Sequence, residues 1–397
     1  MSAETPFRLL VVDDNEMNRD VLARRLRKQA HDVAVAEDGH AALAALKGGG
    51  FDLVLLDVMM PGLGGPEVLA AMKADESLRH VPVIMISASE EMETVVRCIE
   101  LGAEDYLPKP FNPTLLKARV DASLEKKRLR DREQRHAQSL ERDLEIGRQI
   151  QATFFPERLP ERPGWEIAAR FEPARQCAGD FYDAFDLPGG RIALVVADVC
   201  DKGVGAALFM ALFRTLLRAS AGEAGDSRKE APEATLEKTI RLTNDYIAVT
   251  HSRANMFATV FFAILDPATG EFSYVNAGHE PPLLFGPDRA VRELAPTGPA
   301  LGLFASSVFG ISRDGLGPGE CLLAYTDGVT DAKGPEGFFS KERLLALIEG
   351  PVESASALVD GIADAVKRHT GERDRFDDVT LLAAFRRGPS GAGKSGR

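Results

Sequence analysis

Between residue 1 and about residue 122, short apolar runs alternate with segments of helical periodicity. Apolar runs occupy residues 7–12, 33–36 and 51–56, and helical patterns begin near Glu16 and near Gly39. This alternation is typical of an α/β domain in which helices cover both faces of a parallel sheet. We therefore expect a doubly wound parallel sheet for the first domain.

Between about residue 161 and residue 387, apolar runs come in pairs that turn residues separate. One pair consists of residues 256–266 and 271–278, with the sequence Pro-Ala-Thr-Gly between them. Helical patterns interrupt the strands at residues 206–218 and 233–248. Paired strands with few helices favour antiparallel sheets covered by helices. The second domain is therefore predicted to be an α+β fold, a β-sandwich flanked by helices.

A charged segment joins the two domains and is expected to form a helical connector over residues 123–160. Half of residues 121–150 are charged, with interspersed signs and no proline, and aliphatic residues recur at roughly helical spacing. These aliphatic residues are too sparse to define a coiled coil, so a homodimer formed through this helix is a hypothesis. Prolines after Phe154 and Phe155 end the helix. A solvated spacer helix without a signalling role is the alternative.

Composition narrows the classes of partner. The chain has 397 residues, which suits two domains, and a net charge of -12, which argues against binding nucleic-acid phosphates. No apolar run approaches the roughly 20 residues of a membrane span, and the polar first residues do not form an export signal. The four cysteines are scattered without a CxxC pair, which fits a reducing compartment. We therefore expect a cytoplasmic protein with neither a membrane nor a nucleic-acid partner.

Residues 388–397 are expected to form a flexible tail. The sequence GPSGAGKS within it satisfies the spacing of a phosphate-binding P-loop. A P-loop places phosphates on the N-terminus of a following helix, and too little sequence follows here to supply one. The Gly and Ser content instead favours a flexible segment.

Polar residues end the strands that we predict for the first domain, where a parallel sheet gathers its ligands. Asp13 and Asp14 follow the first strand, Asp57 ends the third, Ser87 ends the fourth and Lys109 follows the fifth. Three neighbouring carboxylates need a cation, and an all-oxygen set suits Mg²⁺. A carboxylate beside Mg²⁺ can attack a phosphoryl group and form an aspartyl phosphate, and Asp57 is the best placed nucleophile. Alternatively, each aspartate only caps the following helix.

The first domain resembles the receiver domains of two-component response regulators, which have a flavodoxin-like fold, over about residues 7–122. The motifs VVDDN, LLDVMMPGLGG, MISA and LPKPF carry the resemblance in this order. It implies that Asp57 is the phospho-acceptor and that a histidine kinase or a phosphotransfer protein is the phosphoryl donor. The implied Mg²⁺ ligands are Asp13, Asp14, Asp57 and the backbone carbonyl of Met59, and the implied switch residues are Ser87, Lys109 and Tyr106.

Four pairs of acidic residues stand in turns or at the ends of apolar runs of the second domain. They are Asp180 with Asp183, Asp198 with Asp201, Asp327 with Asp331, and Asp377 with Asp378. Half-buried carboxylates are costly without cations, and because no His or Cys accompanies them we expect Mg²⁺ or Mn²⁺. Two such ions can activate a bridging water and clamp a phosphoryl group, which is the chemistry of phosphate-ester hydrolysis. Each pair taken singly could also be an ordinary turn or cap.

Over about residues 145–385 the chain resembles the PPM family of metal-dependent serine/threonine protein phosphatases, in its SpoIIE-like branch. The runs ALFMALFRTLLR, MFATVFFAILD, VNAGHEPPLL, TGPALGLF and LLAYTDGVTDA carry the resemblance. It implies a site for two Mn²⁺ or Mg²⁺ ions, in which Asp198 also positions a metal-bound water. The implied ligands are Asp180, Asp198, Asp327, Asp377 and the carbonyl of Val199, with Asp378 and Asp183 as further candidates. Whether Asp377 or Asp378 is the direct ligand stays open.

Two positions depart from the pattern of this family. Ala178 stands where many relatives have Gly, and Lys202 stands at a position often occupied by His, which puts protonation of the leaving serine in doubt. Arg175, shortly before Asp180, is a candidate for attracting the substrate phosphate because guanidinium suits bidentate phosphate contacts. A lone arginine is also commonly a surface residue.

The two resemblances together imply a response regulator in which phosphorylation of Asp57 acts on the phosphatase through the connector helix, with activation as the expected direction. The implied substrate is a phosphoserine or phosphothreonine protein, such as a STAS-type anti-sigma factor antagonist in a partner-switching pathway. One alternative is a catalytically silent phosphatase fold that serves as an adaptor switched by the receiver. Another is a phosphatase of small phosphoesters. The retention of all four acidic positions argues against the adaptor.

Overall fold

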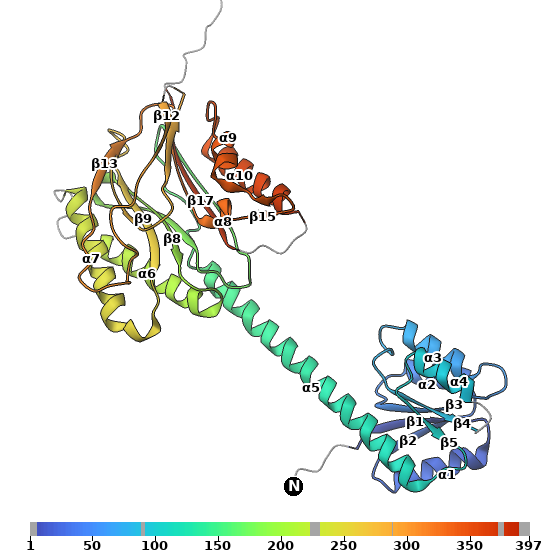
Figure 1. Ribbon diagram of the computed structural model, residues 1–397. Coiled ribbons are helices and arrows are strands. Elements are labelled where there is room, and N and C mark those ends of the chain that lie inside the picture. Colours follow the sequence, from blue (N-terminus) through green and yellow to red (C-terminus); the bar gives the residue numbers. More distant parts are fainter. Residues whose placement is uncertain (1–5, 89–91, 223–230, 288, 372–376, 389–397) are drawn as a thin grey trace, which may run out of the picture. The chain divides into compact units, whose positions relative to one another are not determined.

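The structure is a computed structural model that describes residues 6–88, 92–222, 231–287, 289–371 and 377–388. The chain divides into two compact units, Met1–Leu140 and Glu141–Arg397. Figure 1 shows that the first is an α/β unit and the second is built from β-sheets and helices. Of the tail expected at residues 388–397, all but Gly388 lies outside the described residues.

The first unit contains a five-stranded sheet with the strand order β2-β1-β3-β4-β5. Its strands are β1 (Arg8–Val12), β2 (Asp32–Ala36), β3 (Leu53–Asp57), β4 (Val83–Ser87) and β5 (Asp105–Pro108). All neighbouring strands pair in parallel. The chain moves from β1 to one edge of the sheet and then to the other, so the predicted doubly wound fold is confirmed.

Helices cover both faces of this sheet because its strands carry apolar side chains on both sides. The helices are α1 (Glu16–Arg27), α2 (Gly39–Lys47), α3 (Gly65–Ala74) and α4 (Met92–Glu100). Leu9 of β1 belongs to the core that includes α1, whereas Leu10 belongs to the core that includes α2 and α3. Asp38 accepts a hydrogen bond from the amide of Ala41 at 2.7 Å and so fixes the start of α2.

One helix, α5 (Pro113–Ala152), continues from the first unit into the second. Asn112 caps its start by accepting hydrogen bonds from the amides of Thr114 and Leu115. The helical connector was predicted over residues 123–160, but the helix begins earlier and ends at Ala152. It begins earlier because residues 113–122 continue the same helical pattern with their apolar side chains buried on the sheet, and prolines follow its end.

The second unit is a sandwich of two five-stranded antiparallel sheets, with the orders β13-β10-β9-β8-β7 and β12-β11-β14-β17-β6. The first sheet contains β7 (Phe181–Asp186), β8 (Ile192–Val199), β9 (Ala258–Leu265), β10 (Glu271–Ala277) and β13 (Ser312–Gly315). The second contains β6 (Trp165–Glu172), β11 (Leu283–Gly286), β12 (Arg289–Glu293), β14 (Cys321–Tyr325) and β17 (Val379–Arg386). Leu194 and Phe261 of the first sheet share a core with Leu322 and Leu382 of the second. The predicted sandwich is therefore confirmed.

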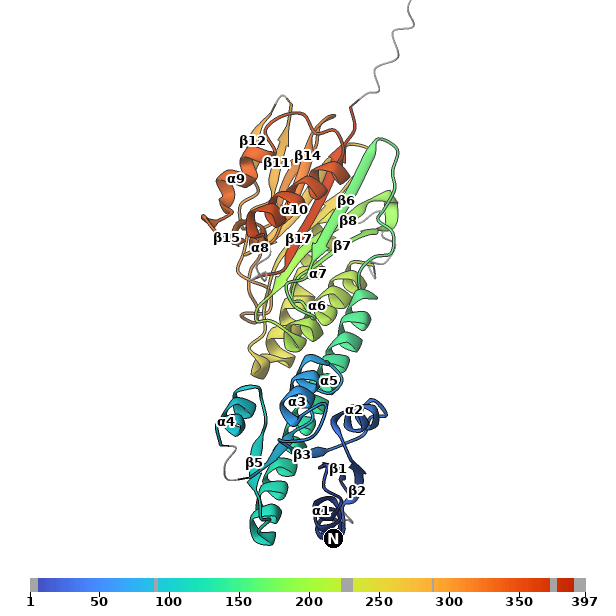
Figure 2. The same ribbon diagram turned by 90° about the vertical axis from the view of Figure 1, so that its right-hand side faces the viewer.

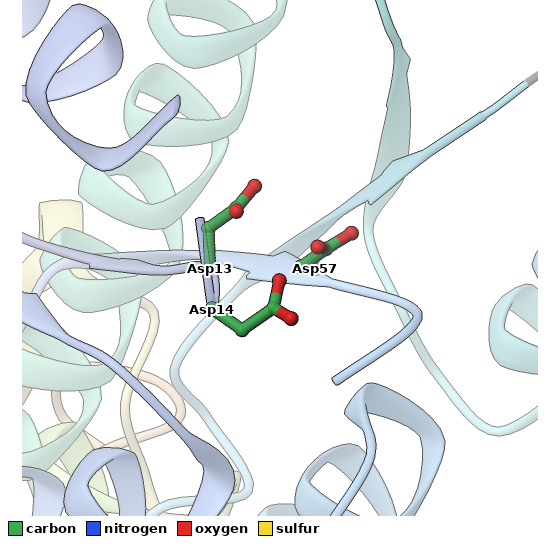
Figure 3. A group of neighbouring side chains, drawn as sticks. All are labelled: Asp13, Asp14 and Asp57. Atoms are coloured by element: carbon green, nitrogen blue, oxygen red, sulfur yellow. The ribbon is translucent and has the colours of Figure 1, made fainter. Parts of the chain in front are cut away.

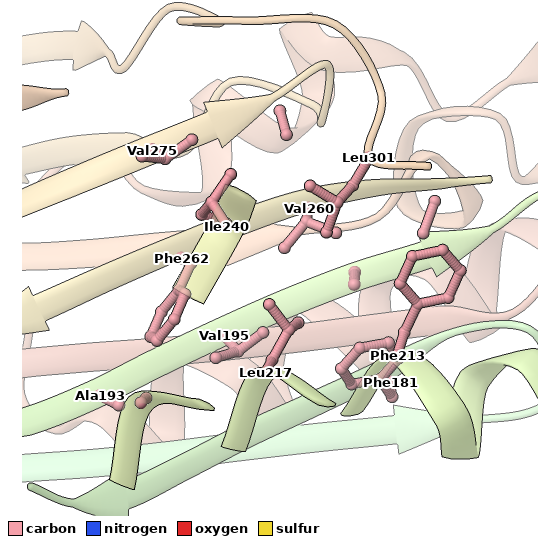
Figure 4. Close-up of a cluster of buried hydrophobic side chains, with 14 of the residues drawn as sticks. Phe181, Ala193, Val195, Phe213, Leu217, Ile240, Val260, Phe262, Val275 and Leu301 are labelled. Carbon is pink, nitrogen blue, oxygen red and sulfur yellow. The ribbon is translucent and has the colours of Figure 1, made fainter. Parts of the chain in front are cut away.

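Helices cover the outer faces of the sandwich (Figure 2). One face carries α6 (Val204–Gly222) and α7 (Pro232–Thr250), and the other carries α9 (Ser340–Leu347) and α10 (Ala355–Thr370). Figure 4 shows Phe213 and Leu217 of α6 and Ile240 of α7 within the core formed with Val195 and Phe262 of the first sheet. The short elements are η2 (Pro188–Gly190), η3 (Ser252–Ala254), α8 (Asp327–Thr330), β15 (Lys333–Gly334) and β16 (Gly337–Phe338).

Among the described residues, α6 is long and apolar enough, by length and composition alone, to cross a membrane. We did not anticipate this from the sequence, because two arginines interrupt its apolar runs. Arg214 and Arg218 both bind the buried carboxylate of Asp183 on β7, at 3.1 Å and 2.9 Å. With Phe213 fully buried, these contacts are those of a core helix in a folded domain.

We expect Asp183→Asn to destabilise the second unit by about 3 kcal/mol, because it leaves the largely buried guanidinium of Arg214 without its countercharge. Trp165 is the single tryptophan and lies in the core between the sheets, so its fluorescence during urea unfolding reports on this unit. The matched control is Asp186→Asn on the same strand. Asp186 forms an exposed pair with Arg162, whose loss should cost less than about 1 kcal/mol. Equal losses of unfolding free energy in the two variants would contradict the role of Asp183 as the countercharge of Arg214.

Candidate functional site

The first cluster of carboxylates lies at the ends of β1 and β3 in the first unit. Because these strands are parallel neighbours, Asp13 after β1 and Asp57 at the end of β3 lie side by side. One oxygen from each of Asp13, Asp14 and Asp57 lies within 4.8 Å of the other two. Figure 3 shows the three side chains together at this edge of the sheet. Asp13 and Asp57 are buried, whereas Asp14 is exposed.

Lys109 brings a positive charge to this cluster. Its ammonium lies 2.7 Å from Asp57 Oδ2 and 3.0 Å from Asp13 Oδ2, and the bond from Lys109 to Pro110 is a cis peptide. Burial, together with the charges of Asp13 and Asp14, raises the pKa of Asp57 to about 6 although Lys109 opposes the shift. One ammonium does not neutralise three carboxylates, so the set of oxygen ligands fits a Mg²⁺ ion.

The other residues predicted for the receiver site lie on neighbouring elements. Ser87 ends β4 and is buried, and its carbonyl oxygen accepts a hydrogen bond from the Lys109 amide at 2.8 Å. Tyr106 lies on β5, with the guanidinium of Arg119 5.0 Å from its ring centroid. Met59 lies in the loop after β3 and has an exposed side chain. The structure thus places Ser87, at the end of β4, beside Lys109, which directly follows β5.

The second cluster of carboxylates lies where strand ends of the two sheets of the sandwich meet. In the first sheet, Asp180 precedes β7 and Asp198 lies near the end of its antiparallel neighbour β8. In the second sheet, Asp327 follows β14 and Asp377 lies shortly before its antiparallel neighbour β17. Antiparallel pairing puts the end of one strand beside the start of the next, so each sheet contributes a pair of aspartates.

Hydrogen bonds join the two sheets at this point. The hydroxyl of Thr380 on β17 donates to Asp180 Oδ2 at 2.7 Å, across 200 residues of sequence. The amide of Gly179 donates to Asp378 Oδ2 at 3.1 Å. Residues that lie far apart in the sequence are therefore held in one place.

The carboxylates of this cluster repel one another. Burial, followed by the charges of Asp198 and Asp378, raises the pKa of Asp180 well above its ordinary value. Burial and the charge of Asp327 raise the pKa of Asp198 to about 7, and burial and the charge of Asp377 raise that of Asp327 to about 6. Carboxylates with oxygen-only surroundings and unfavourable mutual charge fit Mg²⁺ or Mn²⁺.

The spacing of the second cluster differs from that of the first. In the part of the chain that the structure describes, only the trio of Asp13, Asp14 and Asp57 brings three ligand oxygens within 4.8 Å of one another. The aspartates of the sandwich are therefore more widely spaced.

Asp377 and Asp378 make different contacts. Asp378 accepts hydrogen bonds from the amides of Ala174 at 2.7 Å and Gly179 at 3.1 Å, and so clamps both ends of the loop that leads into β7. Asp377 accepts one hydrogen bond from the Asp378 amide at 3.0 Å and another from the Lys202 ammonium at 2.8 Å. Asp378 thus holds a loop in place. The charge of Asp377, by contrast, raises the pKa of the Asp327 carboxyl more than any other neighbouring charge does.

The remaining two predicted residues have different surroundings. The carbonyl oxygen of Val199 abuts the loop before β7, since a Cβ on Gly179 would lie 2.7 Å from it. Asp183 is not brought to the cluster, because Arg214 and Arg218 bind its carboxylate on the side of α6.

Sequence reasoning missed three contributors to this region. Thr380 follows Asp378 by two residues in the sequence, but its hydroxyl was not considered. Lys202 was noted as a departure from the family and not as a countercharge. Gln151, in the motif at the end of the connector, is buried and binds Ala178 twice, donating to its carbonyl at 2.7 Å and accepting from its amide at 3.1 Å. The available signal was the position of this glutamine at the end of the charged segment, shortly before Phe154 and Phe155.

In EDTA at about pH 8, we expect Asp198→Asn to raise the thermal unfolding midpoint by several degrees, because it removes a buried charge from a crowded cluster. The folded pKa of Asp198, about 7, lies above its value in an unfolded chain. The loss of folding stability that the charged Asp198 causes in the wild type is therefore complete above about pH 7, and it disappears as the pH falls toward about 4. Circular dichroism melts over this range measure it. A lower midpoint for the variant at pH 8 would contradict the expectation.

Comparisons with known proteins agree with the two units. Residues 188–387 match the family model described as Stage II sporulation protein E (SpoIIE), and residues 9–121 match the response regulator receiver domain. The chain is 43% identical to Protein IcfG of Synechocystis sp., over 62% of this chain and 41% of IcfG, so it spans less than half of that relative. It is 28% identical to Phosphoserine phosphatase RsbU of Bacillus subtilis, over 63% of this chain and 72% of RsbU.

A solved structure shows the fold of the second unit. The SiaA-PP2C domain of Pseudomonas aeruginosa is 21% identical, with a TM-score of 0.50, over 63% of this chain and 98% of that one. The match to the family model and this shared fold both agree with the sandwich that contains the second cluster. The chain therefore belongs to the SpoIIE family of PPM-type phosphatase domains and carries a two-component receiver domain ahead of it.

Proposed function

We propose that this chain is a response regulator in which phosphorylation of Asp57 controls a metal-dependent protein-serine/threonine phosphatase. The observation that carries the proposal is the meeting of two aspartate pairs, one from each sheet, at one end of the sandwich. Their raised pKa values indicate charge that divalent cations would neutralise. Similarity to a protein named as a phosphoserine phosphatase supports the reaction class.

The proposed metal ligands are the four aspartates that line this end of the sandwich, together with one backbone carbonyl. They are Asp180, Asp198, Asp327, Asp377 and the carbonyl of Val199. Two bound Mn²⁺ or Mg²⁺ ions supply an activated water and charge stabilisation for the phosphoryl group. Asp198 positions that water, and Asp378 holds the loop before Asp180 through backbone hydrogen bonds.

In the first unit, we propose that Asp57 accepts the phosphoryl group beside a Mg²⁺ ion. Asp13, Asp14, Asp57 and the carbonyl of Met59 hold the ion, and Ser87, Lys109 and Tyr106 form the switch. The ammonium of Lys109, already 2.7 Å from Asp57, is placed to bind an oxygen of the phosphorylated aspartate. The donor is a histidine kinase or a phosphotransfer protein.

The proposed substrate is a phosphoserine or phosphothreonine protein in the cytoplasm, with a STAS-type anti-sigma factor antagonist as the leading example. Arg175 is exposed in the loop that Asp378 clamps, where a guanidinium could attract the substrate phosphate. The working boundaries are residues 1–122 for the receiver, 123–160 for the connector and 161–387 for the phosphatase. A homodimer through the connector remains part of this hypothesis.

Gln151 suggests how the connector reaches the metal centre. It lies in the last turn of α5, and its amide holds both backbone groups of Ala178, two residues before Asp180. A buried amide with both polar groups paired is costly to displace, so a movement of the helix end would move this loop. We infer that phosphorylation acts on Asp180 by this route.

An adaptor with a silent phosphatase fold is the alternative function. It would retain the fold while losing the chemistry, so only an activity measurement separates it from the proposal. The presence of all four aspartates at one end of the sandwich favours the enzyme.

We expect the full-length protein to hydrolyse p-nitrophenyl phosphate and a phosphoserine peptide in Mn²⁺, and to stop when EDTA is added. Asp198→Asn should lower kcat by more than about 100-fold, because the charge that holds the nucleophilic water is lost. Asp186→Asn, on an exposed site of β7, is the control and should retain activity. Turnover of the small ester without the peptide would indicate a phosphatase of small phosphoesters. No turnover by folded protein that binds Mn²⁺ would support the adaptor.

We expect beryllofluoride, which mimics an aspartyl phosphate, to raise the rate of peptide hydrolysis. Asp57→Ala should abolish the response while retaining the basal rate, since the mimic needs that carboxylate. Gln151→Ala should weaken the response even with Asp57 intact, because the connector then loses its hold on Ala178. Phosphatase assays with and without beryllofluoride compare the three proteins. A response that persists in Asp57→Ala would refute control by the receiver.

A further inference from the structure

An ion pair between Lys202 and Asp377 lies within the second cluster. The ammonium of Lys202 is 2.8 Å from Asp377 Oδ2, and the two residues are 175 positions apart in the sequence. Both side chains are 29% exposed, so the pair is partly shielded from water. Lys202 lies in the turn after β8, the strand that contains Asp198, and Asp377 lies in the segment before β17. The contact therefore joins these two parts of the chain.

The turn that carries Lys202 has a constrained backbone. Asp201 and Gly203, on either side of the lysine, both have positive φ values, of 75° and 85°. The amide of Lys202 also donates to Asp201 Oδ1 at 2.8 Å. A non-glycine residue rarely adopts a positive φ without support from its surroundings. The base of the lysine side chain is therefore fixed, while its four-carbon stem stays flexible.

Both oxygens of Asp377 are engaged in this arrangement. Oδ1 accepts the amide of Asp378 at 3.0 Å, and Oδ2 accepts the ammonium. The positive charge of Lys202 also opposes the rise in the pKa of the neighbouring Asp327 carboxyl. The lysine thus supplies part of the charge compensation that divalent cations would otherwise supply.

We propose that Lys202 is a built-in competitor of the divalent cation at Asp377, so that it sets the metal affinity of this half of the centre. The ammonium and a metal ion would share the negative charge of Asp377 and would repel each other, so metal binding at Oδ2 weakens or breaks the contact with the lysine. The metal-free cluster gains a countercharge, and metal binding is weakened by the cost of breaking the pair. This inference rests on the proposed role of Asp377 as a metal ligand.

Calorimetric titration of the full-length protein with Mn²⁺ tests the proposal. Lys202→Gln and Lys202→Met, which remove the charge, should bind Mn²⁺ roughly tenfold more tightly at one site, the equivalent of a partly buried ion pair. Lys202→Arg, which keeps the charge, should retain an affinity near that of the wild type. The receiver cluster is the same in all four proteins, so its contribution cancels in the comparison.

Thermal unfolding in EDTA gives the second readout. The two neutral variants should unfold at a lower temperature than the wild type, because the metal-free cluster has lost its countercharge. Tighter Mn²⁺ binding combined with a less stable metal-free protein is the result that a purely structural lysine would not give. Unchanged or weaker Mn²⁺ binding in both neutral variants would overturn the proposed role of Lys202 but not the proposed metal centre. A wild type with no Mn²⁺ bound outside the receiver would overturn the proposed metal centre as well.

Discussion

The repulsion between neighbouring carboxylates is the constraint on which the rest of this molecule depends. Each added negative charge makes the folded state less favourable, and burial increases the cost. Both units place their aspartates at strand ends whose preceding or following residues are buried in apolar cores. The burial of those strands supplies the free energy that holds the charges together. Cation binding then acts on a site that folding has already assembled.

The two units limit this repulsion by different means. In the receiver, the single ammonium of Lys109 lies between Asp13 and Asp57. In the sandwich, the ammonium of Lys202 pairs with Asp377, and neutral donors add to it, since Thr380 donates to Asp180 and two backbone amides donate to Asp378. Neutral donors lower the cost of a carboxylate without occupying the site as a charge would.

The sequence was sufficient to predict the fold and to place the candidate residues at strand ends. It was not sufficient to predict the contacts that these residues make. Asp57 was predictable because parallel strands end at a common edge, a rule that needs only the strand pattern. The pairing of Asp183 with Arg214 was not predictable, since it depends on how α6 packs against β7. The start of α5 at Pro113 was also not predicted, because helical periodicity alone does not show where a packed helix becomes a connector.

The loop between Ala174 and Gly179 is held through its backbone at three residues. Asp378 binds its two end amides, and Gln151 binds both backbone groups of Ala178. A shape fixed in this way does not depend on most of the side chains that the loop carries, with Gly179 as an exception because a Cβ would meet Val199. Exposed residues such as Arg175 can therefore change in evolution while the neighbouring aspartates keep their places.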